Sequence, residues 1–139
     1  MFLEIKNTTI GYQKPLISEV NASLDFGDVC LLIGNNGVGK TTLIKSILNQ
    51  ISLLQGDILI NKKNVIKLTD KEIAEQIAVV FAKSQIPANY TTEDLISLGK
   101  FIHLPFYYQL ENEDVEHVNI IISQLKLEEY RNTQLQKLS

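Results

Sequence analysis

The chain has 139 residues, which is the length of one domain or of part of one. Its 45% hydrophobic and 21% charged content is typical of a globular protein, and its net charge of −3, without a long basic run, argues against a nucleic-acid partner. No apolar run approaches the length of a membrane span, and the N-terminus lacks a signal-peptide pattern. We therefore expect a soluble cytoplasmic protein, and any association with a membrane would have to come through a partner.

The first part of the chain predicts a small antiparallel β unit. Residues 2–10 alternate as a strand, Gly11 and Pro15 bracket a turn, and a second strand follows with a bulge expected between Ile17 and Val20. The apolar run at residues 29–33 predicts a buried parallel strand. Cys30, the only cysteine, is expected to pack inside that strand rather than to carry redox chemistry.

Residues 34–42 read Gly-Asn-Asn-Gly-Val-Gly-Lys-Thr-Thr, which fits the phosphate-loop pattern G-x-x-x-x-G-K-[ST]. The apolar run lies before this loop, and apolar residues at helical spacing lie after it, from Leu43 to Leu48. Strand, glycine-rich loop and helix together are the context in which this pattern binds a nucleoside triphosphate.

The chemistry of such a loop assigns a task to each part. Glycines tolerate unusual backbone angles and let the main chain approach phosphate, while the N–H groups of residues 37–42 and the helix N-terminus attract the anion. Lys40 is predicted to reach the β- and γ-phosphates as the catalytic lysine, the Thr41 hydroxyl to bind Mg²⁺, and Thr42 to lie near the α-phosphate. The candidate site for ATP and Mg²⁺ comprises Gly34, Asn35, Asn36, Gly37, Val38, Gly39, Lys40, Thr41 and Thr42.

Several further elements are expected along the chain. Residues 55–57 predict a turn, Ile58 and Ile60 a strand, and residues 78–81 a second buried strand. Thr69 and Glu72 form a capping-box pattern at the start of one helix. Another short helix is expected to open at residues 91–94 and close at Gly99, the longest helix begins at Asn112, and residues 128–139 predict a short helix or a loop.

Two groups of side chains are not assigned to a functional site. The aromatic residues between positions 101 and 110 are either core or a docking surface. The two histidines, His103 and His117, lack the spacing of a metal site and are expected at the surface.

The order of these features resembles the nucleotide-binding domain of ATP-binding-cassette (ABC) transporters, and residues 32–43 carry the closest match. The segment at residues 91–104 resembles the subfamily that serves iron–siderophore, haem and cobalamin importers. The resemblance implies an α/β fold, a P-loop NTPase core with an N-terminal antiparallel β unit and a partial helical subdomain. Its implied parts are residues 1–33, the β unit leading to the central strand; 34–81, the P-loop core; and 82–139, the helical subdomain.

The same resemblance implies the partners and one more site residue. Tyr12 stands where the family has an aromatic residue that stacks on adenine. Such stacking is physically reasonable, since a flat aromatic ring can stack on any base. Residues 82–139 would dock on membrane-spanning permease subunits, and two nucleotide-binding domains would pair around ATP as a homodimer. The protein would then lie at the inner membrane surface and couple ATP hydrolysis to import.

The chain departs from the family pattern at two places. A family glutamine is expected after residue 81, where Ala82 and Lys83 stand instead and Gln85 follows. The family signature begins Leu-Ser, which are Leu138 and Ser139 here, and no apolar run followed by Asp is found. The residues therefore predict that this chain is the N-terminal part of a longer protein. The full-length protein is expected to be an ATP hydrolase, whereas this chain alone is expected to bind nucleotide and to hydrolyse little or none.

Other functions fit parts of the pattern. One is a soluble ABC ATPase outside transport, in DNA repair or at the ribosome, and another is a binding-only remnant. A small-molecule kinase also carries a phosphate loop, although such enzymes usually open with it and lack a preceding β unit.

Overall fold

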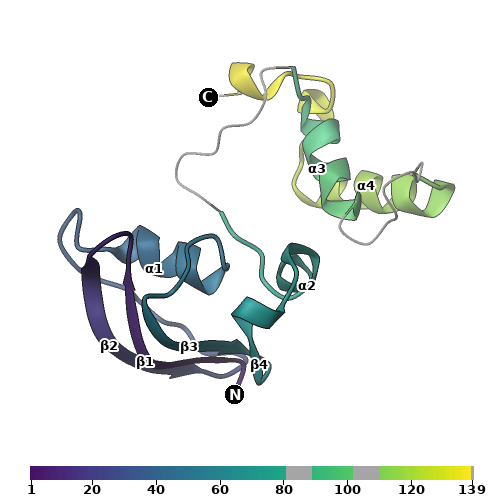
Figure 1. Cartoon of the computed structure of the whole chain (residues 1–139). Coiled ribbons are helices and arrows are strands. Elements are labelled where there is room, and N and C mark those ends of the chain that lie inside the picture. Colours follow the sequence, from purple (N-terminus) through teal and green to yellow (C-terminus); the bar gives the residue numbers. More distant parts are fainter. Residues whose placement is uncertain (81–88, 102–109, 139) are drawn as a thin grey trace. The chain divides into compact units, whose positions relative to one another are not determined.

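The computed structural model describes residues 1–80, 89–101 and 110–138. The chain forms two compact units, Met1–Gln76 and Ile77–Ser139 (Figure 1). Each unit is described by itself below.

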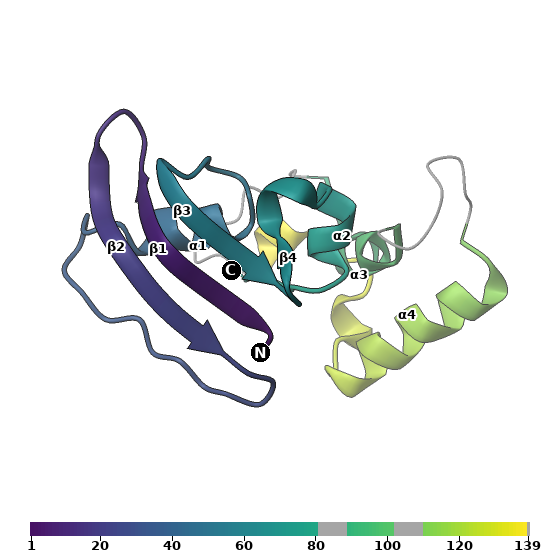
Figure 2. The ribbon, with the colours of Figure 1, turned by 60° about the horizontal axis from the view of Figure 1, so that its bottom comes forward.

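The first unit is built on a four-stranded antiparallel sheet. Its strands are β1 (Leu3–Gly11), β2 (Pro15–Leu24), β3 (Gln55–Ile60) and β4 (Lys63–Asn64), in the order β2-β1-β3-β4. Helix α1 (Lys40–Ile47) packs over one face of this sheet, above β1, as Figures 1 and 2 show from two directions. The short 3-10 helix η1 (Val65–Lys67) and helix α2 (Asp70–Ala74) follow β4. This arrangement confirms the predicted antiparallel β unit.

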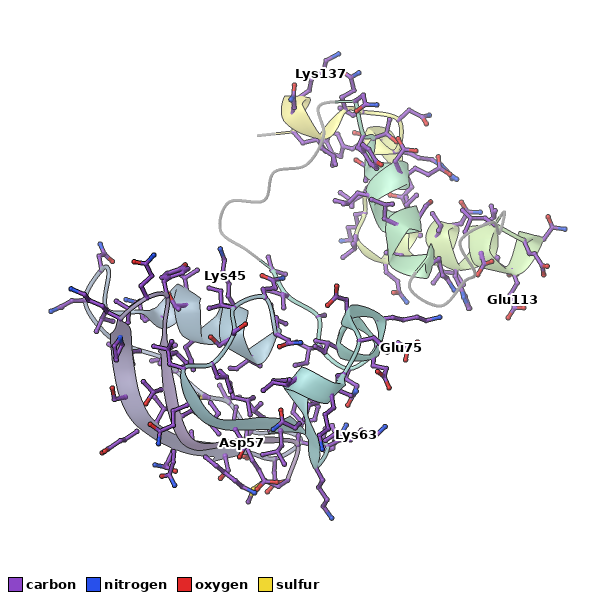
Figure 3. All side chains as sticks on the ribbon, viewed as in Figure 1. Lys45, Asp57, Lys63, Glu75, Glu113 and Lys137 are labelled. Carbon is purple, nitrogen blue, oxygen red and sulfur yellow. The ribbon has the colours of Figure 1, made fainter. Side chains whose placement is uncertain are left out.

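Alternating apolar residues of the strands form the core of this unit. Ile10, Ile58, Ile60 and Val65 are completely buried. The remaining buried apolar side chains are Leu3, Ile5, Leu43, Leu68 and Ile73. Charged side chains such as Asp57, Lys63 and Glu75 extend from the outside of the unit instead (Figure 3). The core thus holds the sheet and the first helical turn after residue 39 as one body.

The irregularities of the sheet follow from particular residues. Thr8 pairs with Val20 and Ile10 with Ile17, which leaves one extra residue in β2 and confirms the predicted bulge. The turn expected at residues 55–57 is wrong, since these residues open β3. Gly56 has φ 82°, and a Cβ there would lie 2.4 Å from the Asn7 carbonyl oxygen, so glycine marks an irregular register here rather than a turn.

The buried strand expected at residues 29–33 is also wrong. These residues adopt no strand, Val29 and Leu31 are 98% and 80% exposed, and Cys30 is exposed rather than packed. A parallel strand needs neighbours for its N–H and C=O groups, and the four described strands pair only with one another. Residues 78–80, the described part of the other expected strand, likewise form none.

The second unit contains helix α3 (Thr92–Phe101) and helix α4 (Asn112–Gln124), followed by 3-10 turns η2 (Glu128–Tyr130) and η3 (Leu135–Lys137). Helix α4 begins at the predicted residue. The predicted end of α3 at Gly99 is wrong, because the helix continues two residues further and Gly99 does not adopt a positive φ. Gln85, Ala82, Lys83, His103 and most of the aromatic segment lie outside the described residues.

Helices α3 and α4 pack against each other through a small apolar core in which Val118 and Ile122 are buried. The C-terminal turns return to the start of α3, where the Arg131 guanidinium donates to both carboxylate oxygens of Glu93 at 2.9 and 2.5 Å. Exposed His117 accepts from the Lys100 ammonium at 2.5 Å, in keeping with the expected surface position. Over the described ranges, no helix has the length and apolarity that a bilayer span requires.

Candidate functional site

The glycine-rich loop enters helix α1 through a left-handed residue. Gly39 is the N-cap of α1 with φ 109°, and Gly37 has φ 84°. These angles favour glycine strongly, because a side chain at positive φ is strained. The loop before them is tightened by a hydrogen bond from Val38 N–H to the Asn35 carbonyl oxygen at 3.3 Å. The backbone therefore turns at these glycines, and α1 begins directly after the loop.

The start of α1 presents backbone donors. Leu43 N–H makes the first helical bond, to the Gly39 carbonyl oxygen at 2.8 Å. No side chain of the described residues caps this helix, and its first turn has no acidic residue. The N–H groups at the beginning of a helix have no partner within the helix and lie at its positive dipole end. This terminus is suited to a phosphate group.

Lys40 is folded over the loop that precedes it. Its Nζ donates to the Gly34 carbonyl oxygen at 2.5 Å and to the Asn35 carbonyl oxygen at 2.8 Å. Two neutral carbonyls leave the charge of the ammonium uncompensated. The two hydrogen bonds thus hold the Lys40 ammonium beside the loop, and its positive charge can still attract an anion.

These groups enclose a hollow of about 200 Å³. Its lining consists of Asn36, Gly37, Gly39, Lys40, Thr41 and Thr42. Six of the predicted site residues therefore surround one space. Gly34 and Asn35 contribute the carbonyls that hold Lys40, and Val38 lies against Gly34, where an added Cβ would meet its Cγ1 at 3.0 Å.

The donor set of the hollow also suits Mg²⁺ brought in with a phosphate. Thr41 and Thr42 both line the hollow, and Thr41 is exposed whereas Thr42 is buried. Mg²⁺ keeps several waters and takes phosphate oxygens, so a single hydroxyl is a sufficient protein ligand. Among the described residues no group of three His, Cys, Asp or Glu side chains is placed to hold a metal by itself.

Tyr12 lies in a different part of the unit. It occupies the turn between β1 and β2, is 65% exposed, and does not line the hollow at the loop. The turn leaves no room for a side chain at Gly11, where a Cβ would lie 2.1 Å from the Lys14 carbonyl oxygen. Base stacking by Tyr12 stays a prediction.

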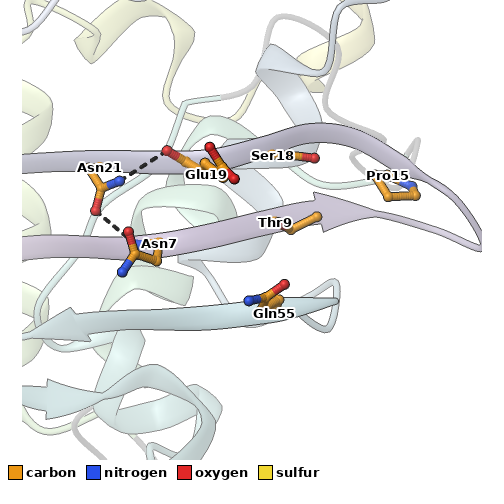
Figure 4. A pocket seen from close by; sticks show the side chains of 7 residues that line it. All are labelled: Asn7, Thr9, Pro15, Ser18, Glu19, Asn21 and Gln55. Atoms are coloured by element: carbon orange, nitrogen blue, oxygen red, sulfur yellow. Dashed lines mark hydrogen bonds between the residues drawn. The ribbon is translucent and has the colours of Figure 1, made fainter.

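A second hollow, of about 500 Å³, lies over β1, β2 and β3 (Figure 4). Its side chains are Asn7, Thr9, Pro15, Ser18, Glu19, Asn21 and Gln55. The Asn21 amide accepts from Asn7 N–H at 2.9 Å and donates to the Glu19 carbonyl oxygen at 3.0 Å. Asn7 and Glu19 both have positive φ, so these bonds serve the irregular ladder itself.

Sequence reasoning missed one contact of the phosphate loop. Ile17 of β2 lies against the backbone of Gly39, where an added Cβ would meet its Cδ1 at 3.0 Å and its Cγ1 at 3.1 Å. No motif signals this contact, because it joins residues of ordinary type that are far apart in the chain.

Comparison with known proteins places these features in a family. The sequence matches the ABC transporter family over residues 17–139. Among curated relatives, the iron(3+)-hydroxamate import ATP-binding protein FhuC of Bacillus subtilis is 28% identical over 138 residues, covering 99% of this chain and 51% of its own. The petrobactin import ATP-binding protein YclP of the same organism is 30% identical, covering 99% and 54%. The chain thus spans about half the length of these relatives.

Solved structures share the fold. A putative ABC transporter ATP-binding protein from Pyrococcus furiosus superposes with a TM-score of 0.75 at 22% identity, covering 100% of this chain and 64% of its own. The cassette MJ0796, in a dimer bound to ADP and phosphate, gives a TM-score of 0.77 at 20% identity, covering 99% and 63%. Both neighbours are ATP-binding proteins of the α/β class that the phosphate loop predicts. With its loop and helix α1 inside the matched region, the chain belongs to the ABC transporter family.

Proposed function

We propose that this chain binds MgATP at the hollow in front of α1. The observation that carries the proposal is the convergence of Lys40, Thr41 and the open N-terminus of α1 on one small space. The helix terminus would receive the β-phosphate, and Lys40 would exchange its two carbonyl contacts for the β- and γ-phosphate oxygens. Thr41 would hold Mg²⁺, which neutralises charge between the two phosphates when bound.

We propose further that the described residues support binding more than hydrolysis. Phosphoryl transfer to water requires a group that orients the attacking water in addition to a positioned phosphate. The lining of the hollow contains amide, hydroxyl, ammonium and backbone groups and no carboxylate. A steady-state ATPase rate that Lys40→Ala abolishes would contradict this part of the proposal.

The biological role that fits best is the energy-coupling ATPase subunit of an importer. The curated relatives named above are import ATP-binding proteins for iron(3+)-hydroxamate and petrobactin, which supports a siderophore-type cargo. Residues 82–139 would dock on permease subunits, two ATP-binding domains would pair as a homodimer, and the protein would lie at the inner face of the membrane. Co-purification with a permease from detergent-solubilised membranes supports this role, and recovery only in the soluble fraction favours a non-transport ABC ATPase.

The binding proposal is tested by equilibrium titration of MgATP against the wild type and Lys40→Ala. A charge-assisted bond contributes ~1.5–3 kcal/mol, so loss of Lys40 should weaken MgATP binding about tenfold to 100-fold. Lys45→Ala is the matched control, because Lys45 lies in the same helix and does not line the hollow. Equal affinity of the wild type and Lys40→Ala would overturn the assignment of the site.

A further inference from the structure

One side chain of the β-sheet reaches the phosphate loop at its most restricted residue. Ile17 of β2 is half-buried, and its Cδ1 and Cγ1 occupy the space in which a Cβ of residue 39 would stand, at 3.0 and 3.1 Å. The Leu16 Cβ lies near the same point, at 3.7 Å. Gly39 is the N-cap of α1 and has φ 109°, so the strand side chain touches the loop where it turns into the helix.

The same strand leads straight to the predicted base-stacking residue. Ile17 pairs with Ile10 across the sheet, and the next recorded pair toward the turn is Gly11 with Pro15. Tyr12 lies in the turn that these pairs close. The turn is close-packed at Gly11, where an added Cβ would lie 2.1 Å from the Lys14 carbonyl oxygen. Ile17 thus touches Gly39 with its side chain and is connected to the turn of Tyr12 through the pairing of β1 with β2.

A purine nucleoside triphosphate that binds through its base and its phosphates needs these two contacts at a fixed separation. The affinity of such a two-point ligand depends on how well both contacts are pre-organised. In this unit α1 would carry the phosphate contact and the β1–β2 turn the base contact, and Ile17 of β2 touches the loop at the N-cap of α1.

We propose that Ile17 is a positioning residue that sets the distance between the phosphate loop and Tyr12. The inference rests on the proposed MgATP binding and on the predicted stacking of Tyr12 on the base, and it goes beyond both. Ile17 acts by filling the space beside Gly39, which keeps the strand and the loop at one separation. Removal of its side chain lets that separation vary, so the base contributes less to affinity while the phosphate contact is kept.

The test compares two ligands, MgATP and magnesium tripolyphosphate, which has the phosphates and no base. The Ile17→Ala variant should bind MgATP about tenfold more weakly, or ~1.4 kcal/mol, and tripolyphosphate within twofold of wild type. The Ile17→Val variant, which keeps most of the contact, should restore most of the MgATP affinity. Val20→Ala is the control, since Val20 is a half-buried residue of the same strand that does not line the loop.

A double variant separates positioning from general support. If Ile17 acts through Tyr12, then Ile17→Ala in the Tyr12→Ala background should cost no further MgATP affinity. Equal weakening of both ligands, additivity with Tyr12→Ala, or an unchanged MgATP affinity would each overturn the inference while the binding proposal stands. A wild type that binds neither ligand would overturn the binding proposal and the inference with it.

Discussion

At the scale of single residues, the two threonines that follow Lys40 differ in exposure. Both line the hollow, but Thr41 is exposed whereas Thr42 is 7% exposed. Only an accessible hydroxyl can meet a metal ion that arrives with a hydrated phosphate. The difference follows from helix geometry, because consecutive residues of a helix point in different directions.

We therefore predict that Thr41→Val weakens binding of MgATP but not of metal-free ATP. The substitution keeps the shape of the side chain and removes the hydroxyl, and the expected loss is about tenfold, or ~1.4 kcal/mol. Titrations with excess Mg²⁺ and with EDTA check this result. Thr41→Ser should retain the wild-type response to Mg²⁺, and an equal loss in both titrations would mean that Thr41 does not serve the metal.

At the scale of elements, an ion pair between Arg131 and Glu93 joins the C-terminal turns of the second unit to the start of α3. The Arg131 guanidinium, through two hydrogen bonds, holds the pKa of the Glu93 carboxyl below its ordinary value of 4.5. A carboxyl whose pKa is lower in the folded state stabilises the fold above its unfolded pKa. This contribution is lost as the pH falls through the lower, folded pKa.

The expected consequence is a pH-dependent effect of Glu93→Gln. The variant should lower the midpoint of urea unfolding at pH 7, and its effect should shrink as the pH falls below 4.5 and through the lower, folded pKa of the Glu93 carboxyl. A series of urea unfolding curves from pH 7 downward, followed by circular dichroism, measures this trend. Glu116→Gln makes the same change of charge at an exposed position of α4, and it should have little effect at any pH in the series. An effect of Glu93→Gln that stays constant over the whole series would exclude the ion pair as its cause.

Elements with a complete local signal were predictable from the sequence. The capping box of Thr69 and Glu72 forms as expected, with Thr69 Oγ1 accepting from Glu72 N–H at 3.2 Å. The phosphate loop likewise carries its geometry in its own glycines. By contrast, residues 29–33 have the composition of a buried strand, but a strand also needs a partner, which lies outside the information in five residues. The Ile17 contact with Gly39 was beyond prediction for a similar reason, since it depends on the packing of β2 against the loop.

At the scale of the whole molecule, burial separates two apolar segments of similar composition. Ile58 in β3 is fully buried, whereas Leu31 in the segment before the loop is 80% exposed. Truncation of a buried isoleucine loses both transfer energy and packing, at a cost of about 2–5 kcal/mol. Truncation of an exposed leucine changes stability by about 0.5 kcal/mol or less.

Ile58→Ala should therefore destabilise the chain strongly and Leu31→Ala hardly at all. Urea unfolding followed by circular dichroism measures both free energies under the same conditions. Because Leu31 is exposed, Leu31→Ala should also reduce binding of a dye that reports apolar surface. Similar destabilisation by the two variants would show that residues 29–33 are packed as a strand after all.

The most direct test of nucleotide binding at the loop is a map of backbone amide shifts on addition of MgATP. We predict the largest changes at the N–H groups of residues 37–42, with similar changes from magnesium tripolyphosphate, because those groups would receive the phosphates. The amides of β4 and α4 should be unaffected and serve as internal controls. Changes centred elsewhere, or no changes at saturating MgATP, would contradict the assignment of this loop as the nucleotide site.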